Sequence, residues 1–265
     1  MPDGSDVTET TLVIAACVVG GLLIGSFLTV VVDRVPRGAS VVAPPSACGA
    51  CGNRLGVPDL VPVVSWVALR GRCRHCGTRI GIEPVVVELA TATLFVVFGL
   101  RFGASIELLA FCVLAAALVA LTWIDLREQR LPREITYTAM AIGAPLLAVA
   151  AVIAGEPERI WMMLLGAGIG LVLMLAIYLG ARGGMGEGDV RLAPLLGLYL
   201  GWLNPGIVPI GIFFGFLLGA VVGVAVMVAR RGDRRTALPF GPFLAAGTVL
   251  AVFAGQPFVD LVLQR

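Results

Sequence analysis

A glycine-rich stretch with two acids, Gly183-Gly184-Met185-Gly186-Glu187-Gly188-Asp189, lies between two long apolar runs. The alternate glycines Gly184, Gly186 and Gly188 allow positive φ and let a second chain approach the backbone closely. We therefore expect them to form a loop that binds an extended substrate. Asp189 is a typical helix-capping residue, so we also expect it to cap the helix that follows. An ordinary helix start, with a glycine-rich turn and an Asp cap, would contain the same residues. A catalytic role for Asp189 therefore requires a second acid as its partner.

A second acid, Asp125, directly continues an apolar run, whereas Glu128 lies in the polar connection that follows. Taken alone, Asp125 is also explained as an interfacial anion among arginines. Two carboxylates that face each other, however, form the apparatus of an aspartic protease. They share a proton, so that one activates water while the other protonates the peptide carbonyl. Asp125 and Asp189 are therefore the candidate catalytic residues.

Four of the six cysteines form two Cys-x-x-Cys pairs, Cys48 with Cys51 and Cys73 with Cys76. Two such pairs, with 21 residues between them, are typical of a site that presents four thiolates tetrahedrally to Zn²⁺. The segment 33–84 has few aliphatic residues, so a bound metal would supply folding energy that a core cannot. Disulfides are the alternative, which a reducing cytoplasm disfavours.

His75, the only histidine, lies inside the second cysteine pair. It is either a substitute for one thiolate or, as we favour, a solvent-facing residue. A single histidine in this position excludes a Ser-His or Cys-His hydrolase and a metalloprotease with several histidine ligands.

Composition places these residues in a membrane protein. Hydrophobic residues make up 58% of the 265 residues and charged residues 14%, and the mean hydropathy is +0.98. Such a chain is polytopic and all-α rather than a soluble globule. We expect about eight transmembrane helices, with the small zinc-knuckle segment between the first and the second. The predicted spans are 12–32, 85–100, 105–124, 137–154, 160–180, 192–202, 207–229 and 239–261.

The positions of the arginines indicate the topology, because the chain has no lysine and all 19 basic residues are arginines. Sixteen of them lie in four alternate connections: 33–84, 125–136, the glycine-rich loop with its flanks, and the segment after the seventh span. By the positive-inside rule these connections face the cytoplasm and both chain ends face outward. The zinc-knuckle segment, Asp125 and Asp189 are then all cytoplasmic. Short arginine segments between spans also argue against a nucleic-acid partner.

These observations divide the chain into three parts. Residues 1–32 form an outside tail and the first transmembrane helix, residues 33–84 the zinc-knuckle domain, and residues 85–265 the transmembrane peptidase domain. The tail is acidic and lacks the positive n-region of a cleaved signal peptide, so we expect the first apolar run to be retained. The run 192–202 is shorter than the roughly 20 residues that a crossing helix needs, which favours a site at the glycine-rich loop before it.

Several motifs, in order along nearly the whole chain, resemble the bacterial type IV prepilin peptidases (leader peptidase and N-methyltransferase). This family lies within the GxGD intramembrane aspartic proteases, which include presenilin. The matching stretches are Gly25-Ser26-Phe27-Leu28-Thr29-Val30-Val31-Val32-Asp33-Arg34-Val35-Pro36, the two cysteine pairs, Glu88, Asp125 with Leu131-Pro132, Gly184-Met185-Gly186-Glu187-Gly188-Asp189 with Leu192, and Pro239-Phe240-Gly241-Pro242-Phe243-Leu244.

The resemblance implies an enzyme of the bacterial inner membrane that cuts the basic leader from prepilins or pseudopilins of type IV pili or type II secretion. The cut would follow a glycine at the cytoplasmic face. The resemblance further implies N-methylation of the new N-terminal residue, often phenylalanine, with S-adenosylmethionine. The partners would be this protein substrate and the lipid bilayer.

The sequence departs from the family pattern in several places. Thr29 and Leu60 stand where Asn is usual, Arg191 stands where Lys is usual, and residues 81–85 lack the usual Ser-x-Arg-Tyr-Pro. Except for Arg191, these positions lie in the N-terminal part that the family associates with methylation. No residue pattern identifies the S-adenosylmethionine site or the oligomeric state.

Two other functions are compatible with parts of the sequence. A proton-coupled membrane transporter would use intramembrane acids near the middle of the bilayer as proton relays. A zinc-knuckle membrane scaffold would carry out no chemistry and would leave the two aspartates far apart. The placement of the two carboxylates relative to each other therefore separates the enzyme from both alternatives.

Overall fold

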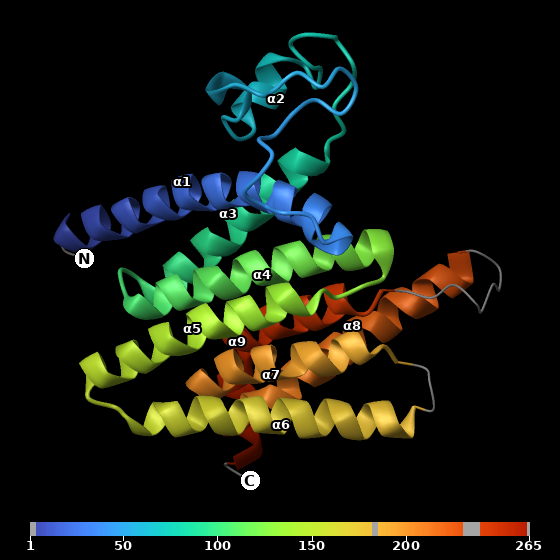
Figure 1. Cartoon of the computed structure of the whole chain (residues 1–265). Helices are drawn as coiled ribbons and strands as arrows, with labels where there is room; N and C mark the ends of the chain where they lie inside the picture. The colour runs from blue at the N-terminus through green and yellow to red at the C-terminus, as the bar shows by residue number, and fades with distance from the viewer. Residues whose placement is uncertain (1–3, 182–184, 230–238, 264–265) are drawn as a thin grey trace. The chain divides into compact units, whose positions relative to one another are not determined.

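The computed structural model describes residues 4–181, 185–229 and 239–263, and these residues are mainly helical. Apart from helices they contain only turns, loops and two isolated β-bridges. Three short helical segments, η1, η2 and α2, lie between the first two long helices (Figure 1). The helices are α1 Gly4–Arg34, η1 Val35–Arg37, η2 Val57–Asp59, α2 Val64–Ala68, α3 Glu83–Phe102, α4 Ile106–Glu128, α5 Arg133–Ala154, α6 Glu158–Gly180, α7 Glu187–Leu203, α8 Ile207–Ala229 and α9 Gly241–Leu263.

Seven of the eight long helices in the described residues are long and apolar enough to cross a membrane, which confirms the predicted polytopic all-α class. The remaining one is α7, which corresponds to the short predicted run 192–202. Its 17 residues span about 25 Å at 1.5 Å per residue, less than the roughly 30 Å of a bilayer core. The chain is thus a multi-pass membrane protein with one shorter helix.

Several helices extend beyond the predicted apolar runs, because helical hydrogen bonding continues into polar residues until the chain turns. Helix α5, for example, begins at Arg133 rather than at 137 and ends before Gly155, whose φ of 72° stops the helix. Helix α3 ends in the same way at Gly103, with φ 60°. The apolar pattern therefore located the helices, and glycine set some of their ends.

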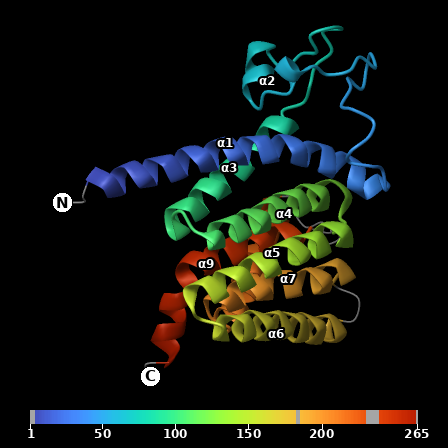
Figure 2. The same ribbon diagram turned by 60° about the vertical axis from the view of Figure 1, so that its left-hand side comes forward.

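The chain divides into two compact units, residues 1–120 and 121–265, with the division inside α4. In the first unit α1 packs along α3 (Figure 2). The two helices come into near backbone contact at Gly21 and Gly25. A Cβ at Gly21 would lie 2.5 Å from Cα of Ala92, and one at Gly25 would lie 2.6 Å from Cα of Glu88. Small residues are required wherever helices approach this closely.

The second unit is organised around α7, which contacts α5, α6, α8 and α9. Residues 195–202 of α7 are all buried, including Tyr199 and Trp202. Helices α6 and α7 lie side by side in both views (Figures 1 and 2). A side chain at Gly166 on α6, or at Gly197 or Gly201 on α7, would overlap backbone atoms of the other helix. Glycine packing thus holds the short helix at the centre of the unit.

The alternating helix directions bring three helix ends of this unit to one side. These are the C-terminal turns of α4, the N-terminus of α7 and the N-terminus of α9, at the right-hand end in Figure 1. Asp125 lies on the first and Asp189 on the second.

Candidate active site and metal centre

Asp125 lies one turn before the end of α4 and is only 5% exposed. Its Oδ2 accepts a 2.9 Å hydrogen bond from the backbone N–H of Gly241, the first residue of α9. The carboxylate therefore occupies the positive end of a helix dipole. A Cβ at Gly241 would lie 2.9 Å from this oxygen and 3.0 Å from Cδ2 of Leu131, so only glycine gives the N–H this approach.

Asp189 is buried, 7% exposed, and is the third residue of α7. The expectation that it caps the helix is wrong, because α7 begins at Glu187 and its N-cap is Gly186. The Asp189 carboxylate instead reaches back and accepts a hydrogen bond from the backbone N–H of Gly186. An acid at the third helical position can satisfy the N-cap amide in this way, which leaves glycine free to take the cap position.

The two aspartates share one neighbourhood within the second unit. The charge of Asp125 acts on Asp189 by direct electrostatic repulsion. Leu131, in the connection after α4, packs beside both acidic sites. A Cβ at Gly188 would lie 3.0 Å from Cβ of Leu131, and Leu131 also abuts Gly241 next to Asp125. The structure thus brings together two carboxylates that are 64 residues apart in the sequence.

The predicted loop glycines differ in what the structure requires of them. Gly186 has φ −79° and Gly188 is helical, so neither uses the positive φ that glycine allows. Gly188 is needed instead for close approach, because Leu131 fills the space where its side chain would stand. Gly184 lies outside the described residues. Beside the loop, Glu187 and Arg191 form an exposed ion pair at 2.5 Å.

The two cysteine pairs converge in the first unit. The four sulfur atoms of Cys48, Cys51, Cys73 and Cys76 all lie within 4.8 Å of one another, and the Sγ atoms of Cys48 and Cys76 are 3.8 Å apart. Four thiolates at a Zn–S distance of about 2.3 Å in a tetrahedron stand about 3.8 Å apart. The residues therefore fit a tetrahedral zinc ion, and all four cysteines are free thiols rather than disulfides.

The two pairs have the same local geometry. The N–H of Gly52 donates to the carbonyl of Cys48, and that of Gly77 donates to the carbonyl of Cys73. Both glycines have positive φ, 71° and 70°. An isolated β-bridge closes each turn, Ala47 with Arg54 and Arg72 with Arg79. His75 is not part of the sulfur cluster.

The thiols of the cluster do not titrate alike. Hydrogen bonds from the side chain and backbone of Thr78 lower the pKa of Cys76 to about 6, and backbone N–H groups of Cys51 and Ala50 lower the pKa of Cys48. A backbone hydrogen bond from Asn53 lowers the pKa of Cys51. Desolvation and the neighbouring thiols together outweigh this hydrogen bond and raise the pKa to about 11. A cation shared by all four would favour the thiolate at every position.

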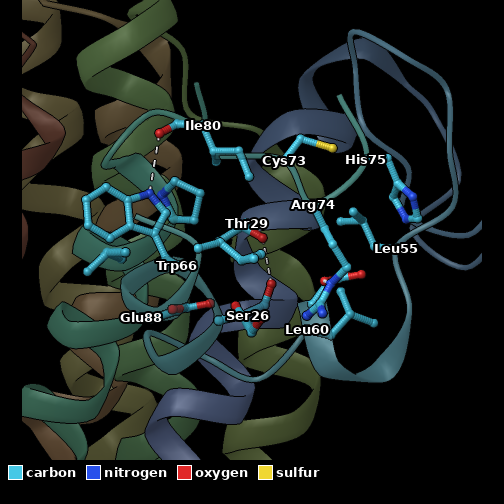
Figure 3. A pocket seen from close by; sticks show the side chains of 15 residues that line it. Ser26, Thr29, Leu55, Leu60, Trp66, Cys73, Arg74, His75, Ile80 and Glu88 are labelled. Carbon is cyan, nitrogen blue, oxygen red and sulfur yellow. Dashed lines mark hydrogen bonds and ion pairs between the residues drawn. The ribbon is translucent and has the colours of Figure 1, made fainter. Parts of the chain in front are cut away.

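A cavity of about 150 Å³ in the first unit was not predicted from the sequence (Figure 3). Its lining includes Ser26 and Thr29 of α1, Trp66 of α2 and Glu88 of α3. In the sequence, Glu88 matches a family motif but has no predicted role. A glutamate within an apolar run was the available signal, but its neighbours come from three separate segments. Gly241 and Leu131 likewise belong to motifs that predict no role for them.

Comparison with known proteins gives a consistent result. Residues 19–102 match the bacterial peptidase A24 N-terminal domain, and residues 112–224 match the type IV leader peptidase family. A prepilin leader peptidase/N-methyltransferase of Bacillus subtilis is 32% identical over 92% of this chain and 95% of its own length. Proteins with the same description from Pseudomonas putida and Xanthomonas campestris are each 34% identical. They cover 94% and 91% of this chain, and 93% and 91% of their own lengths.

No solved structure matches the chain significantly. The two family matches are consecutive, and each of the three relatives covers more than nine-tenths of this chain. The resemblance drawn from the motifs is thereby confirmed, and the chain belongs to the type IV leader peptidase family.

Proposed function

We propose that this protein is an intramembrane aspartic endopeptidase. It removes the basic leader from type IV prepilins or pseudopilins, cutting after glycine at the cytoplasmic face, with Asp125 and Asp189 as the catalytic pair. The observation that carries the proposal is the burial of these two acids in one electrostatic neighbourhood, around Leu131. Both lie within a turn or so of a helix end, which argues against a proton relay at mid-bilayer and against a scaffold with separated acids.

Among the residues that the structure describes, each carboxylate has one backbone donor, Gly241 for Asp125 and Gly186 for Asp189. An ionised carboxylate accepts about four hydrogen bonds, so both retain capacity for a shared proton and for a water molecule. The ionised acid removes a proton from the water, and the water oxygen attacks the peptide carbonyl carbon. The protonated acid gives its proton to the carbonyl oxygen. The C–N bond then breaks as the leaving nitrogen takes a proton.

Gly186 leaves the backbone beside Asp189 open. The atom nearest to a Cβ at this position would be Oδ2 of Asp189 itself, at 3.6 Å. A substrate with glycine before its scissile bond is slender in the same way, so the two backbones can approach each other. We expect the substrate to lie extended along residues 185–188 at this point.

The same chain is proposed to methylate the amino group that cleavage releases. The relatives' description includes N-methyltransferase, and a methyltransferase of this kind uses S-adenosylmethionine as its methyl donor. Zinc at Cys48, Cys51, Cys73 and Cys76 is structural in this proposal, because four protein ligands close the coordination sphere.

The proposed location is the bacterial inner membrane. The distribution of arginines supports a topology with both termini outside and with the zinc-knuckle segment and the catalytic pair at the cytoplasmic side. In functional terms, residues 1–32 supply the outside tail and first span, residues 33–84 bind zinc, and residues 85–265 carry the peptidase.

Mass spectrometry of a defined reaction tests this function. Purified full-length protein in detergent would be incubated with a synthetic prepilin peptide and S-adenosylmethionine. The peptide would carry a basic leader, glycine and then phenylalanine followed by an apolar stretch. We expect one cut directly after the glycine and one added methyl group on the new N-terminus. An intact peptide, or cleavage elsewhere in the sequence, contradicts the proposal, and a peptide with valine in place of that glycine is the control.

A further inference from the structure

The cavity of about 150 Å³ in the first unit is lined by a buried carboxylate, that of Glu88. Glu88 is 5% exposed and lies on α3 beside α1, where Gly25 allows the helices to touch. Figure 3 shows Glu88 and Ser26 next to each other in the cavity. In the described part of the chain Glu88 receives hydrogen bonds from the Val63 backbone and the Ser26 side chain, but it forms no ion pair there. A buried carboxylate without a counter-charge is unfavourable, so this site is suited to a cation.

Arg74, the arginine in the lining of the cavity, does not supply that charge. The guanidinium of Arg74 lines the cavity but is bound to Asp59, with Nε and Oδ1 2.7 Å apart. Asp59 also accepts a hydrogen bond from the N–H of Gly56, which fixes the pair. Glu88 is therefore the acid of this cavity that is left for a ligand.

The backbone beside Glu88 is strained in a way that serves this carboxylate. Val63 has φ 59° and ψ −49°, close to a classic γ-turn, a positive-φ conformation that a β-branched residue rarely adopts. In this conformation its N–H donates a 2.7 Å hydrogen bond to Oε2 of Glu88. Strain of this kind persists where surrounding contacts impose it, and it is concentrated at functional sites. The bond fixes one oxygen of the carboxylate.

The rest of the lining is mainly apolar. It includes the indole of Trp66 together with Leu60, Leu69, Ile80 and Val85. The Trp66 ring is itself held, because its N–H donates to the carbonyls of Ile80 and Gly81 at 3.3 and 3.1 Å. An aromatic ring and a carboxylate in one apolar cavity form a combination that binds organic ammonium groups.

We propose that this cavity binds the free α-ammonium group and the first apolar side chain of a peptide, with Glu88 as the counter-ion. The inference rests on the proposed function, because cleavage releases such an N-terminus and methylation modifies it. At about 150 Å³ the cavity holds one residue rather than a whole nucleoside cofactor, since pockets for complete small molecules are about 300–1,000 Å³.

The chemistry of the two reactants also favours the peptide over the methyl donor. The amino group of S-adenosylmethionine has a carboxylate beside it, which Glu88 would repel, whereas a peptide N-terminus has an amide there. In methyl transfer the ammonium first gives a proton to a carboxylate or to water. Its nitrogen then forms a bond to the methyl carbon as the C–S bond breaks, and the sulfur keeps the electron pair of that bond as a thioether.

Binding of a mature-type peptide tests the proposal without any cleavage step. The probes are a peptide beginning with phenylalanine, the same peptide with an acetylated N-terminus, and S-adenosylhomocysteine, each titrated into zinc-loaded full-length protein. We expect the free-amine peptide to bind at least tenfold more tightly than the acetylated one, and S-adenosylhomocysteine not to compete with it. Equal binding of the two peptides, or competition by S-adenosylhomocysteine, overturns the proposal. Failure of the proposed function would instead appear as loss of prepilin cleavage by the wild-type protein.

Two matched variants assign the site. Glu88→Gln keeps the shape of the side chain and an acceptor for the Val63 N–H, and should bring the two peptides to within twofold of each other. Glu83→Gln removes the same charge from an exposed position at the start of the same helix, outside the cavity, and should keep the tenfold preference. A preference retained in Glu88→Gln overturns the assignment.

A cross-linking measurement on the wild-type protein covers the case in which Glu88→Gln does not fold. The peptide then carries benzoylphenylalanine as its first residue, with a free amine, and the cross-linked chain is digested and sequenced by mass spectrometry. We expect attachment within 26–29, 55–75 or 80–88, the segments that contribute residues to the lining. Attachment confined to residues 121–265 overturns the proposal.

Discussion

The backbone N–H of Gly241 donates a 2.9 Å hydrogen bond to Oδ2 of Asp125, across 116 residues of sequence. This bond ties the last turns of α4 to the first residue of α9. It places a carboxylate at a helix N-terminus, where the dipole stabilises negative charge. In the proposed enzyme, α9 therefore positions Asp125 although neither catalytic acid lies on α9.

Replacing Gly241 by alanine should reduce prepilin cleavage by about 10- to 100-fold, equivalent to roughly 1.4–2.7 kcal/mol in the transition state. The added Cβ would stand 2.9 Å from Oδ2 of Asp125 and 3.0 Å from Leu131, so the hydrogen bond must lengthen. Cleavage rates of purified protein measure the effect. Gly168→Ala is the control, because nothing lies within 4 Å of its Cβ. A Gly241→Ala enzyme as active as wild type would show that the bond does not position Asp125.

The contact between Gly188 and Leu131 predicts a rescue. Gly188→Ala should lower cleavage several-fold, because its Cβ would stand 3.0 Å from Cβ of Leu131 and push the start of α7 away. In the wild-type side chain of Leu131, Cδ1 and Cγ would lie 3.4 and 3.5 Å from the methyl group of Gly188→Ala. Leu131→Ala removes these two atoms and keeps the Cβ, and the double variant combines Leu131→Ala with Gly188→Ala. The double variant should therefore recover part of the activity. Coupling between residues in contact is typically about 0.5–3 kcal/mol, and independent, additive effects would contradict this packing.

The sequence was sufficient for the parts of the structure that depend on local composition. The apolar runs located all eight long helices of the described residues, because a span must satisfy its backbone internally and present apolar side chains. The two cysteine pairs predicted the sulfur cluster, since a Cys-x-x-Cys turn followed by glycine is a local conformation. The start of α7 was placed wrongly, because Gly186 and not Asp189 is its N-cap.

Contacts between distant segments could not be predicted in the same way. The type and spacing of residues do not show that Gly241 donates to Asp125, or that Leu131 packs against Gly188. The positive φ of Val63 could not be predicted either, because valine carries no preference for that conformation and the Glu88 side chain that its N–H contacts lies 25 residues away in the sequence. Which helices pack together decides such contacts, and one sequence does not contain that information in readable form.

Zinc should be bound at one ion per chain. Cys48→Ser or a strong chelator should remove the metal and expose residues 38–82 to proteolysis, because a structural zinc site supplies folding energy directly. Cys112→Ser, in α4, should leave the zinc content unchanged. Elemental analysis and limited proteolysis measure both effects. A wild-type protein without zinc that resists proteolysis in this segment would refute the assignment.

Glycine packing between α6 and α7 gives a prediction with an unusual sign. Gly→Ala within a helix normally stabilises by up to about 1 kcal/mol. Gly168→Ala, at an open position on α6, should therefore leave the protein as stable or slightly more so. Gly197→Ala should destabilise it by about 1–3 kcal/mol, because the methyl group meets the carbonyl of Gly166. Thermal unfolding in detergent compares the two variants. Equal stabilities would argue against close glycine packing between α6 and α7.

The most direct test of the catalytic pair is the rate of prepilin cleavage by Asp125→Asn and Asp189→Asn. Each change keeps the size of the side chain and removes the shared proton chemistry. Each should lower the rate by about 10²- to 10⁴-fold while the protein still inserts and binds zinc. Glu128→Gln and Glu187→Gln remove exposed acids next to the same sites and should retain cleavage within a few-fold of wild type. Cleavage at the wild-type rate by either Asn variant would contradict the account.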